Sequence, residues 1–241
     1  MWDSLQLSPT TPLRATGQSE VKSPVDMAAV ETGSIRELYL DAATVGIGIV
    51  ESDRVRERWE KPSVLTSMSI GSLAAHLARA LITVDHYLSQ PVDGGRTIVS
   101  ASQYLNAVAG LADPTSQINV DVRARADAGA TAGYGAVITQ ARELSTTLRH
   151  RLDAEPSDRV VVASGGTSMM LDEYLVTRIV ELTVHTDDLC VSIGKLTPEL
   201  PGLSVTLRTL FETAVNRHGE RAVMHAMVRR ERDNVDALRV L

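Results

Sequence analysis

The chain has 241 residues, of which 44% are hydrophobic and 22% charged, and its formal net charge is -6. This composition is typical of a soluble globular protein, and no apolar run reaches the roughly 20 residues that a membrane span requires. The negative charge argues against nucleic-acid binding, which needs clustered Lys and Arg. We therefore expect neither a membrane nor a nucleic acid as a partner, whereas the oligomeric state stays open.

The chain contains one cysteine, Cys190, which excludes an internal disulfide framework. The amino end also lacks the basic and apolar segments of a signal peptide, so we expect a cytoplasmic protein. Cys190 lies among Leu189, Val191 and Ile193, a setting typical of a small core residue and less typical of a nucleophile.

Residues 1–30 are rich in Ser, Thr, Pro and Gly and show no hydrophobic periodicity. This pattern predicts a disordered tail. Translation starts at either Met1 or Met27, which the sequence does not decide.

Apolar residues at steps of three and four then predict a series of helices. A possible capping box of Ser34 and Glu37 opens the first, which should end near Trp59. Ser69 caps the second, which closes before Pro91. Further helices are expected at 102–111, 117–152, 171–193 and 203–218, with a short extended piece and Gly-rich turn at 159–168. The fold class is all-α, a bundle over 31–197 with a helical extension over 198–241.

A polar stripe runs through the expected helix at 171–193. Its members are Arg178, Glu181, His185, Asp188 and Ser192, whose steps of three and four place them on one face. Apolar residues flank the stripe on both sides, so we expect it to face the interior of the bundle. A buried carboxylate needs a cation, a hydrogen-bond donor or a metal as a partner.

The second helix carries a complementary stripe, made of Ser72, His76, Arg79, Thr83 and His86. Facing helices that each point His and polar residues inward are the usual way in which a bundle builds a metal site. From spacing alone two interpretations stay open: His76, Glu181 and His185 bind one divalent ion, or they form ordinary hydrogen bonds.

The positions along the two helices favour one arrangement. His76 lies level with Glu181 and His185 only if the second and fourth long helices are antiparallel. Simple up-and-down order would make them parallel, so a crossover is required. The long connection over 91–116 can provide it.

Two segments carry a family resemblance: "WEKPSVLTSMSIGSLAAHLARAL" at 59–81 and "LVTRIVELTVHTDDL" at 175–189. Together they resemble the mycothiol-dependent maleylpyruvate isomerase metal-binding domain, a branch of the DinB-like helical bundles. The resemblance covers about 34–194, and the sequence after Pro201 resembles a helical extension common in such proteins. It implies a four-helix bundle with a crossover that binds a divalent metal, usually zinc, through positions matching His76, Glu181 and His185.

The resemblance also implies thiol chemistry. Mycothiol would be the cosubstrate, and its thiolate would attack a small electrophilic substrate, because metal coordination deprotonates a thiol whose ordinary pKa is about 8.5. Three positions depart from the family pattern: Met68 replaces a frequent Trp, Ser72 a frequent Asp, and Asp187 a frequent large residue. These departures lie beside the expected ligands and leave the substrate undetermined, maleylpyruvate included.

We therefore expect a mycothiol-dependent transferase or isomerase. Arg79, Arg178 and Asp188 are its further candidate catalytic residues: the arginines either hold a substrate carboxylate or pair with Glu181 and Asp188, and Asp188 orients a ligating His. His86 is expected to be an ordinary polar residue. Two alternatives remain, a metal-dependent hydrolase without a thiol and a metal-binding bundle without catalytic activity.

Overall fold

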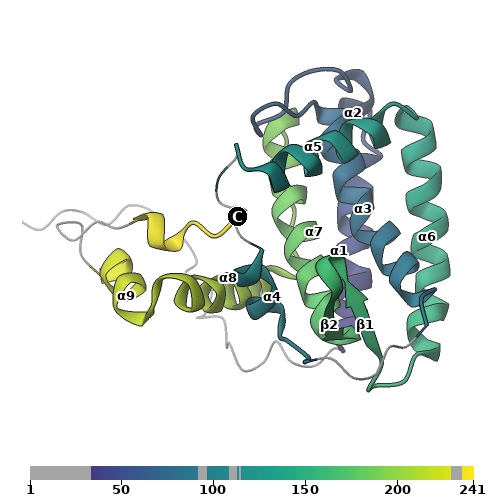
Figure 1. Cartoon of the computed structure of the whole chain (residues 1–241). Helices are drawn as coiled ribbons and strands as arrows, with labels where there is room; N and C mark the ends of the chain where they lie inside the picture. The colour runs from purple at the N-terminus through teal and green to yellow at the C-terminus, as the bar shows by residue number, and fades with distance from the viewer. Residues whose placement is uncertain (1–33, 92–96, 109–112, 114, 229–234) are drawn as a thin grey trace, which may run out of the picture.

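Four long helices pack side by side in the computed structural model, which describes residues 34–91, 97–108, 113, 115–228 and 235–241 (Figure 1). They are α1 (Ile35–Val50), α3 (Ile70–Leu88), α6 (Tyr134–Ala154) and α7 (Leu171–Ile193). The all-α class and the four-helix bundle are confirmed. The tail expected over 1–30 lies outside the described residues, and the domain boundary at 197/198 stays a prediction.

The first and last of these helices run parallel. Arg36, near the start of α1, donates to Asp172 near the start of α7. Arg54, just beyond the end of α1, donates to the carbonyl oxygen of Ile193 at the end of α7. These two contacts at opposite ends fix the direction of both helices.

The other two helices run the opposite way. Tyr87, late in α3, packs against Tyr174, early in α7, while His76, early in α3, packs against His185, late in α7. Arg151 near the end of α6 pairs with Asp85 near the end of α3, so α3 and α6 are parallel to each other. A chain that leaves α3 must therefore return to the opposite end before α6 begins, which is the predicted crossover.

The crossover carries α4 (Ala101–Ala107) and α5 (Gln117–Ala130), and α5 passes in front of the upper parts of α7 and α3 in Figure 1. The prediction of one continuous helix over 117–152 is wrong. The chain breaks between α5 and α6 at Gly133, whose φ of 83° is incompatible with a right-handed helix. The first predicted helix is also interrupted, because Ser52 is extended and opens the short α2 (Asp53–Glu57).

A small hairpin precedes α7. Strands β1 (Val160–Ala163) and β2 (Thr167–Met170) pair antiparallel, with Val160 opposite Met170, around the short turn η1 (Ser164–Gly166). Gly165 turns the chain at a φ of 77°. The sequence predicted the first extended piece and the turn but not the second strand.

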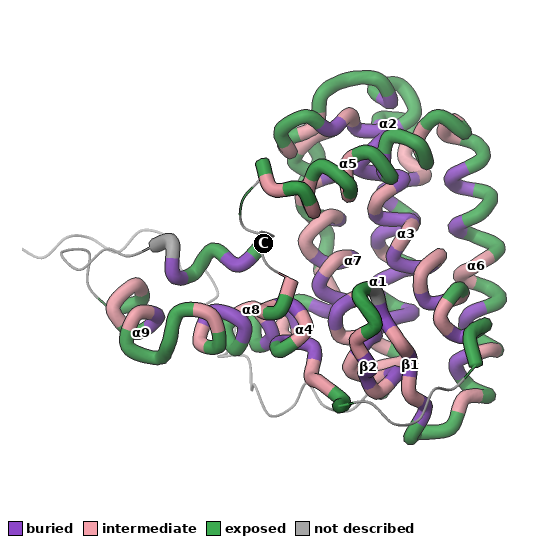
Figure 2. The backbone as a smooth tube through the Cα atoms, viewed as in Figure 1, coloured by how far each residue is buried: buried purple, intermediate pink, exposed green. Residues whose placement is uncertain are grey.

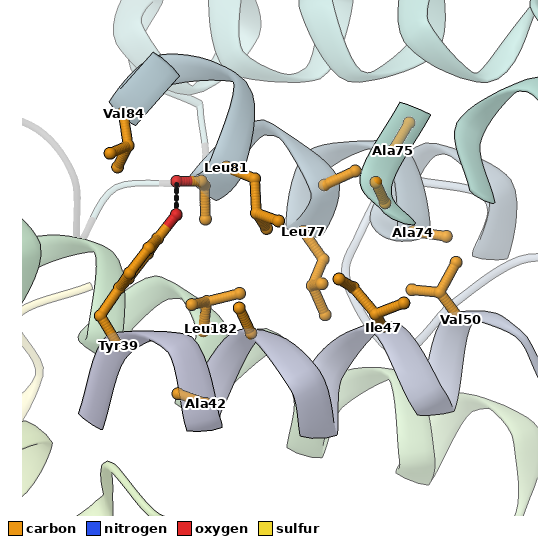
Figure 3. Close-up of a cluster of buried hydrophobic side chains, with 14 of the residues drawn as sticks. Tyr39, Ala42, Ile47, Val50, Ala74, Ala75, Leu77, Leu81, Val84 and Leu182 are labelled. Carbon is orange, nitrogen blue, oxygen red and sulfur yellow. Dashed lines mark hydrogen bonds between the residues drawn. The ribbon is translucent and has the colours of Figure 1, made fainter. Parts of the chain in front are cut away.

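The core fills the space between the long helices, and buried residues line their inner faces (Figure 2). Leu77 and Leu81 of α3 meet Leu182 of α7 in the cluster drawn in Figure 3. In the same view the buried Tyr39 hydroxyl donates to the carbonyl oxygen of Ala80 at 3.1 Å. The core therefore holds α3 and α7 in a fixed register.

The C-terminal segment adds α8 (Leu203–His218), α9 (Glu220–Val228) and a last turn, η3 (Val235–Leu238). Arg217 of α8 donates to the carbonyl oxygens of Leu105 in α4, at 2.9 Å, and of Val240, at 3.0 Å. It thereby ties the crossover and residue 240 to one helix. Among the described helices, none has the length and apolar character of a membrane span.

Candidate metal centre

Local sequence signals determine where α3 begins and where α7 ends, and these two helices carry the site. Ser69 caps α3, its hydroxyl accepting from the amide of Ser72 at 3.0 Å. Helix α7 runs for 23 residues until Gly194, which takes the left-handed conformation (φ 65°, ψ 42°) that stops a helix. His76 therefore lies in the second turn of α3, level with the C-terminal half of α7.

Three of the predicted residues converge between these helices. His76 Nε2 lies 3.2 Å from Glu181 Oε2, and His185 Nε2 lies 3.3 Å from the same oxygen. One donor atom from each of the three residues lies within 4.8 Å of the others. The imidazole rings meet edge to face, with centroids 4.7 Å apart. Both imidazoles thus point the same nitrogen at one carboxylate oxygen.

The surroundings keep this carboxylate charged. Burial alone would raise the pKa of Glu181, but hydrogen bonds with His185 and His76 and the charge of Arg178 hold the pKa well below its usual value. Burial lowers the pKa of His76, against the opposing hydrogen bond with Glu181. An ionised carboxylate and a neutral imidazole are the forms that bind metals.

Two further predicted residues support the triad. Asp188 Oδ2 lies 3.0 Å from His185 Nδ1, on the side of the ring away from Glu181. Burial would lower the pKa of His185, but hydrogen bonds with Asp188 and Glu181 raise the pKa to about 9. Arg178 stacks over Tyr174, with its guanidinium 5.2 Å from the ring centroid, and reaches Glu181 Oε1 at 4.0 Å.

The triad opens into a cavity of about 510 Å³, which is within the usual range for small-molecule sites. Its wall is formed by the loop before α3, by residues of α3, α5 and α7, and by the last residue of the chain: Val64, Leu65, Thr66, Met68, His76, Asn119, Val122, Arg123, Glu181, Val184, His185, Asp188 and Leu241. We call it the larger site cavity. No local pattern predicted that Leu241 would line this cavity, because its place depends on the fold of the C-terminal segment.

A second cavity, of about 350 Å³, shares His76 and Glu181 with the wall of the larger site cavity. Arg79 and Arg178 line it, as does Arg125 of α5. The wall also contains Tyr87, Tyr104 and Tyr174. We call it the arginine chamber. The sequence pointed to Arg79 and Arg178 but not to Arg125 or Tyr104, which the crossover brings to the site.

The other stripe residues serve the fold. Ser72 donates to Asp127, which ties α3 to α5, and Ser192 accepts from the amide of Val64. His86 is exposed and packs on Tyr87, away from the triad. Cys190 is buried in the core, as predicted.

The positions that depart from the family pattern have different surroundings. Met68 is buried and lines the larger site cavity. Asp187 is exposed and accepts a hydrogen bond from Thr197. Of the three positions, only Met68 therefore lies in the wall of a site cavity, where it can affect what the site binds.

The donor set fits a divalent cation. Two imidazole nitrogens and one carboxylate oxygen are typical of catalytic zinc, which keeps a position open for a further ligand. His185 also has the carboxylate partner on its other nitrogen that ligating histidines usually have. His76 Nδ1, by contrast, is buried without a hydrogen-bond partner in the described parts of the chain.

Fold and site together define the class: helical bundles that present an open set of two imidazoles and a carboxylate between facing helices. The family model described as the mycothiol maleylpyruvate isomerase N-terminal domain matches residues 51–190, more than half of the chain. The chain therefore belongs to this family, which confirms the resemblance found in the two motifs. Comparison with curated proteins and with solved structures gives no match.

Proposed function

We propose that this protein is a metal-dependent enzyme that uses mycothiol to transfer a thiol to, or to isomerise, a small electrophilic substrate. The observation that carries the proposal is the convergence of His76, Glu181 and His185 at the wall of a cavity large enough for a small molecule. Membership of the mycothiol maleylpyruvate isomerase family supports the choice of thiol.

His76 and His185 would hold the metal through Nε2, and Glu181 through its carboxylate. A bound divalent cation lowers the pKa of a thiol, so that the nucleophilic thiolate is available at neutral pH. Zinc suits this donor set, and another divalent metal is compatible with it.

The remaining residues prepare the site. Asp188 holds the His185 ring in the orientation that points Nε2 inward. Arg178, partly buried beside Glu181, favours the ionised carboxylate. The loop residues Leu65 and Met68 give the larger site cavity an apolar wall that limits the access of water.

The proposal is tested first by measuring metal content and then by measuring thiol binding. Purified protein should contain about one equivalent of a divalent metal by elemental analysis. The Glu181→Gln variant should lose most of it, because the amide keeps the shape of the side chain but removes the charge. Glu143→Gln is a matched control, since Glu143 is exposed on α6 and does not line the site. Full metal occupancy in Glu181→Gln would contradict the ligand role of Glu181.

Cobalt-substituted protein separates thiol chemistry from simple hydrolysis. Addition of mycothiol should change the visible cobalt spectrum, because a thiolate enters the open position. An unchanged spectrum, together with cleavage of ester or amide substrates in the absence of thiol, would favour a metal-dependent hydrolase. Consumption of mycothiol with a panel of electrophiles then identifies the substrate class.

A further inference from the structure

The arginine chamber concentrates positive charge in a chain whose net charge is -6. Three guanidinium groups line one cavity of about 350 Å³, from three different helices: Arg79 of α3, Arg125 of α5 and Arg178 of α7. Arg79 and Arg178 are partly buried, and Arg125 is exposed. Such an arrangement costs free energy unless an anion compensates it.

The described residues neutralise little of the positive charge in the arginine chamber. The guanidinium groups of Arg79 and Arg125 have neither an ion pair nor a hydrogen bond within the part of the chain that the structure describes. Arg178 reaches one carboxylate there, Glu181, at the long distance of 4.0 Å. Burial lowers the pKa of Arg79, and the like charges of Arg125 and Arg178 lower it further. The chamber therefore holds more donors and more charge than its own residues use.

The position of the chamber relates this charge to the triad. His76, Glu181 and Val122 line both the chamber and the larger site cavity. A molecule held in the chamber would thus contact His76 and Glu181 and leave the larger site cavity, which His185 also lines, open. Tyr87, Tyr104 and Tyr174 supply aromatic wall around the arginines, which suits an organic body attached to a charged group.

We propose that the arginine chamber binds the oxyanion group, carboxylate or phosphate, of an organic substrate. This inference rests on the proposed function for the role of the bound molecule: it is the electrophile, anchored in the chamber by its anion, while the thiol enters through the larger site cavity. Arg79 and Arg178 bind the anion inside the chamber. Arg125, at the exposed edge, attracts it to the entrance.

Calorimetric titration with two probes, succinate and inorganic phosphate, tests the site on the metal-loaded and on the metal-free protein. Arg79→Met should weaken binding of the preferred probe at least about tenfold, because a hydrogen bond to a charged group is lost. Arg125→Met should weaken it about threefold, since an exposed charge contributes less. The probe that binds with the higher affinity identifies the oxyanion: succinate indicates a carboxylate and inorganic phosphate indicates a phosphate.

The matched control is Arg149→Met, which removes one charge from an exposed position on α6 outside the chamber wall and should leave binding unchanged. Thermal melting checks that each variant is folded, and the exposed Arg125 keeps the test available if Arg79→Met unfolds. Equal affinity in Arg125→Met, Arg149→Met and the unchanged protein, or no binding of either probe, would overturn the inference.

The two proposals can fail separately. Arginine-dependent binding that persists in metal-free protein supports the chamber even if mycothiol leaves the cobalt spectrum unchanged, which would refute only the proposed function. Binding that requires the metal and ignores the arginine variants would place the anion on the metal, which overturns the chamber and leaves the thiol chemistry standing.

Discussion

Gly202, just before α8, should tolerate no side chain. A Cβ built at this position would lie 2.3 Å from Ile179 Cγ2 and 2.8 Å from Thr183 Oγ1, both on α7. Two carbon atoms in contact are separated by at least about 3.5 Å, so α8 would have to move by roughly 1 Å. The φ of Gly202 is -81°, which alanine adopts freely, so the cost is steric and not conformational.

We expect Gly202→Ala to lower the free energy of unfolding by about 1–3 kcal/mol, the usual range for overpacking a core contact. Urea denaturation followed by circular dichroism measures the change. Gly48→Ala in α1 is the control, because among the described residues no atom outside its chain neighbours and its own helix backbone lies within 4 Å of its Cβ position. It should stabilise the protein by up to about 1 kcal/mol.

A double mutant isolates the steric contact between position 202 and Ile179. Ile179→Ala removes the methyl group that Gly202→Ala would strike, and by itself should cost about 2–5 kcal/mol. Combined, the two substitutions should cost less than their sum, because the closer of the two clashes, with Ile179 Cγ2, is gone. Additive costs, or a Gly202→Ala variant as stable as the unchanged protein, would refute the proposed contact between α8 and α7.

The remaining predictions concern the metal site and the core. Asp188→Asn should weaken zinc binding about tenfold or more, measured by competition with a chromophoric chelator, because His185 loses its carboxylate partner. Asp187→Asn, the same change at the neighbouring exposed residue, should leave zinc binding unchanged. Equal zinc affinities in the two variants would show that Asp188 does not orient His185. Tyr39→Phe should cost about 1 kcal/mol in urea denaturation, because the buried hydroxyl bonds the Ala80 carbonyl, and no measurable loss would show that this bond is dispensable. Gly71→Ala should cost about 1–3 kcal/mol by the same assay, since its Cβ would lie 2.5 Å from the Trp59 ring, and neutrality would disprove that close packing.

Local signals explain what the sequence predicted well. The bounds of α7 and α8 agree with the expected 171–193 and 203–218, because apolar periodicity is strong there and glycines or prolines flank both helices. The convergence of His76 with Glu181 and His185 also followed from local spacing, once an antiparallel arrangement was assumed. The helix periodicity of 3.6 residues thus determines which side chains can meet.

Long-range packing explains what the sequence missed. The region around Gly133 is rich in Ala and Gly, and the break there became evident only from the positive φ. Arg125 lies on α5, which has only one buried residue, Ala126, so its apolar pattern gave no clue to the face it turns toward the bundle. The path of the crossover places this helix over the site, and no local pattern encodes that path.

The sequence separation between the residues of the triad also affects the order in which the metal site assembles. His76 and Glu181 are 105 residues apart in sequence, whereas Glu181 and His185 are one helical turn apart. A nascent chain therefore presents at most part of the donor set until α7 has emerged and docked against α3, and closing so long a loop is entropically costly. We expect cells to load the metal into the finished bundle, unlike zinc fingers, whose neighbouring ligands let the ion direct folding.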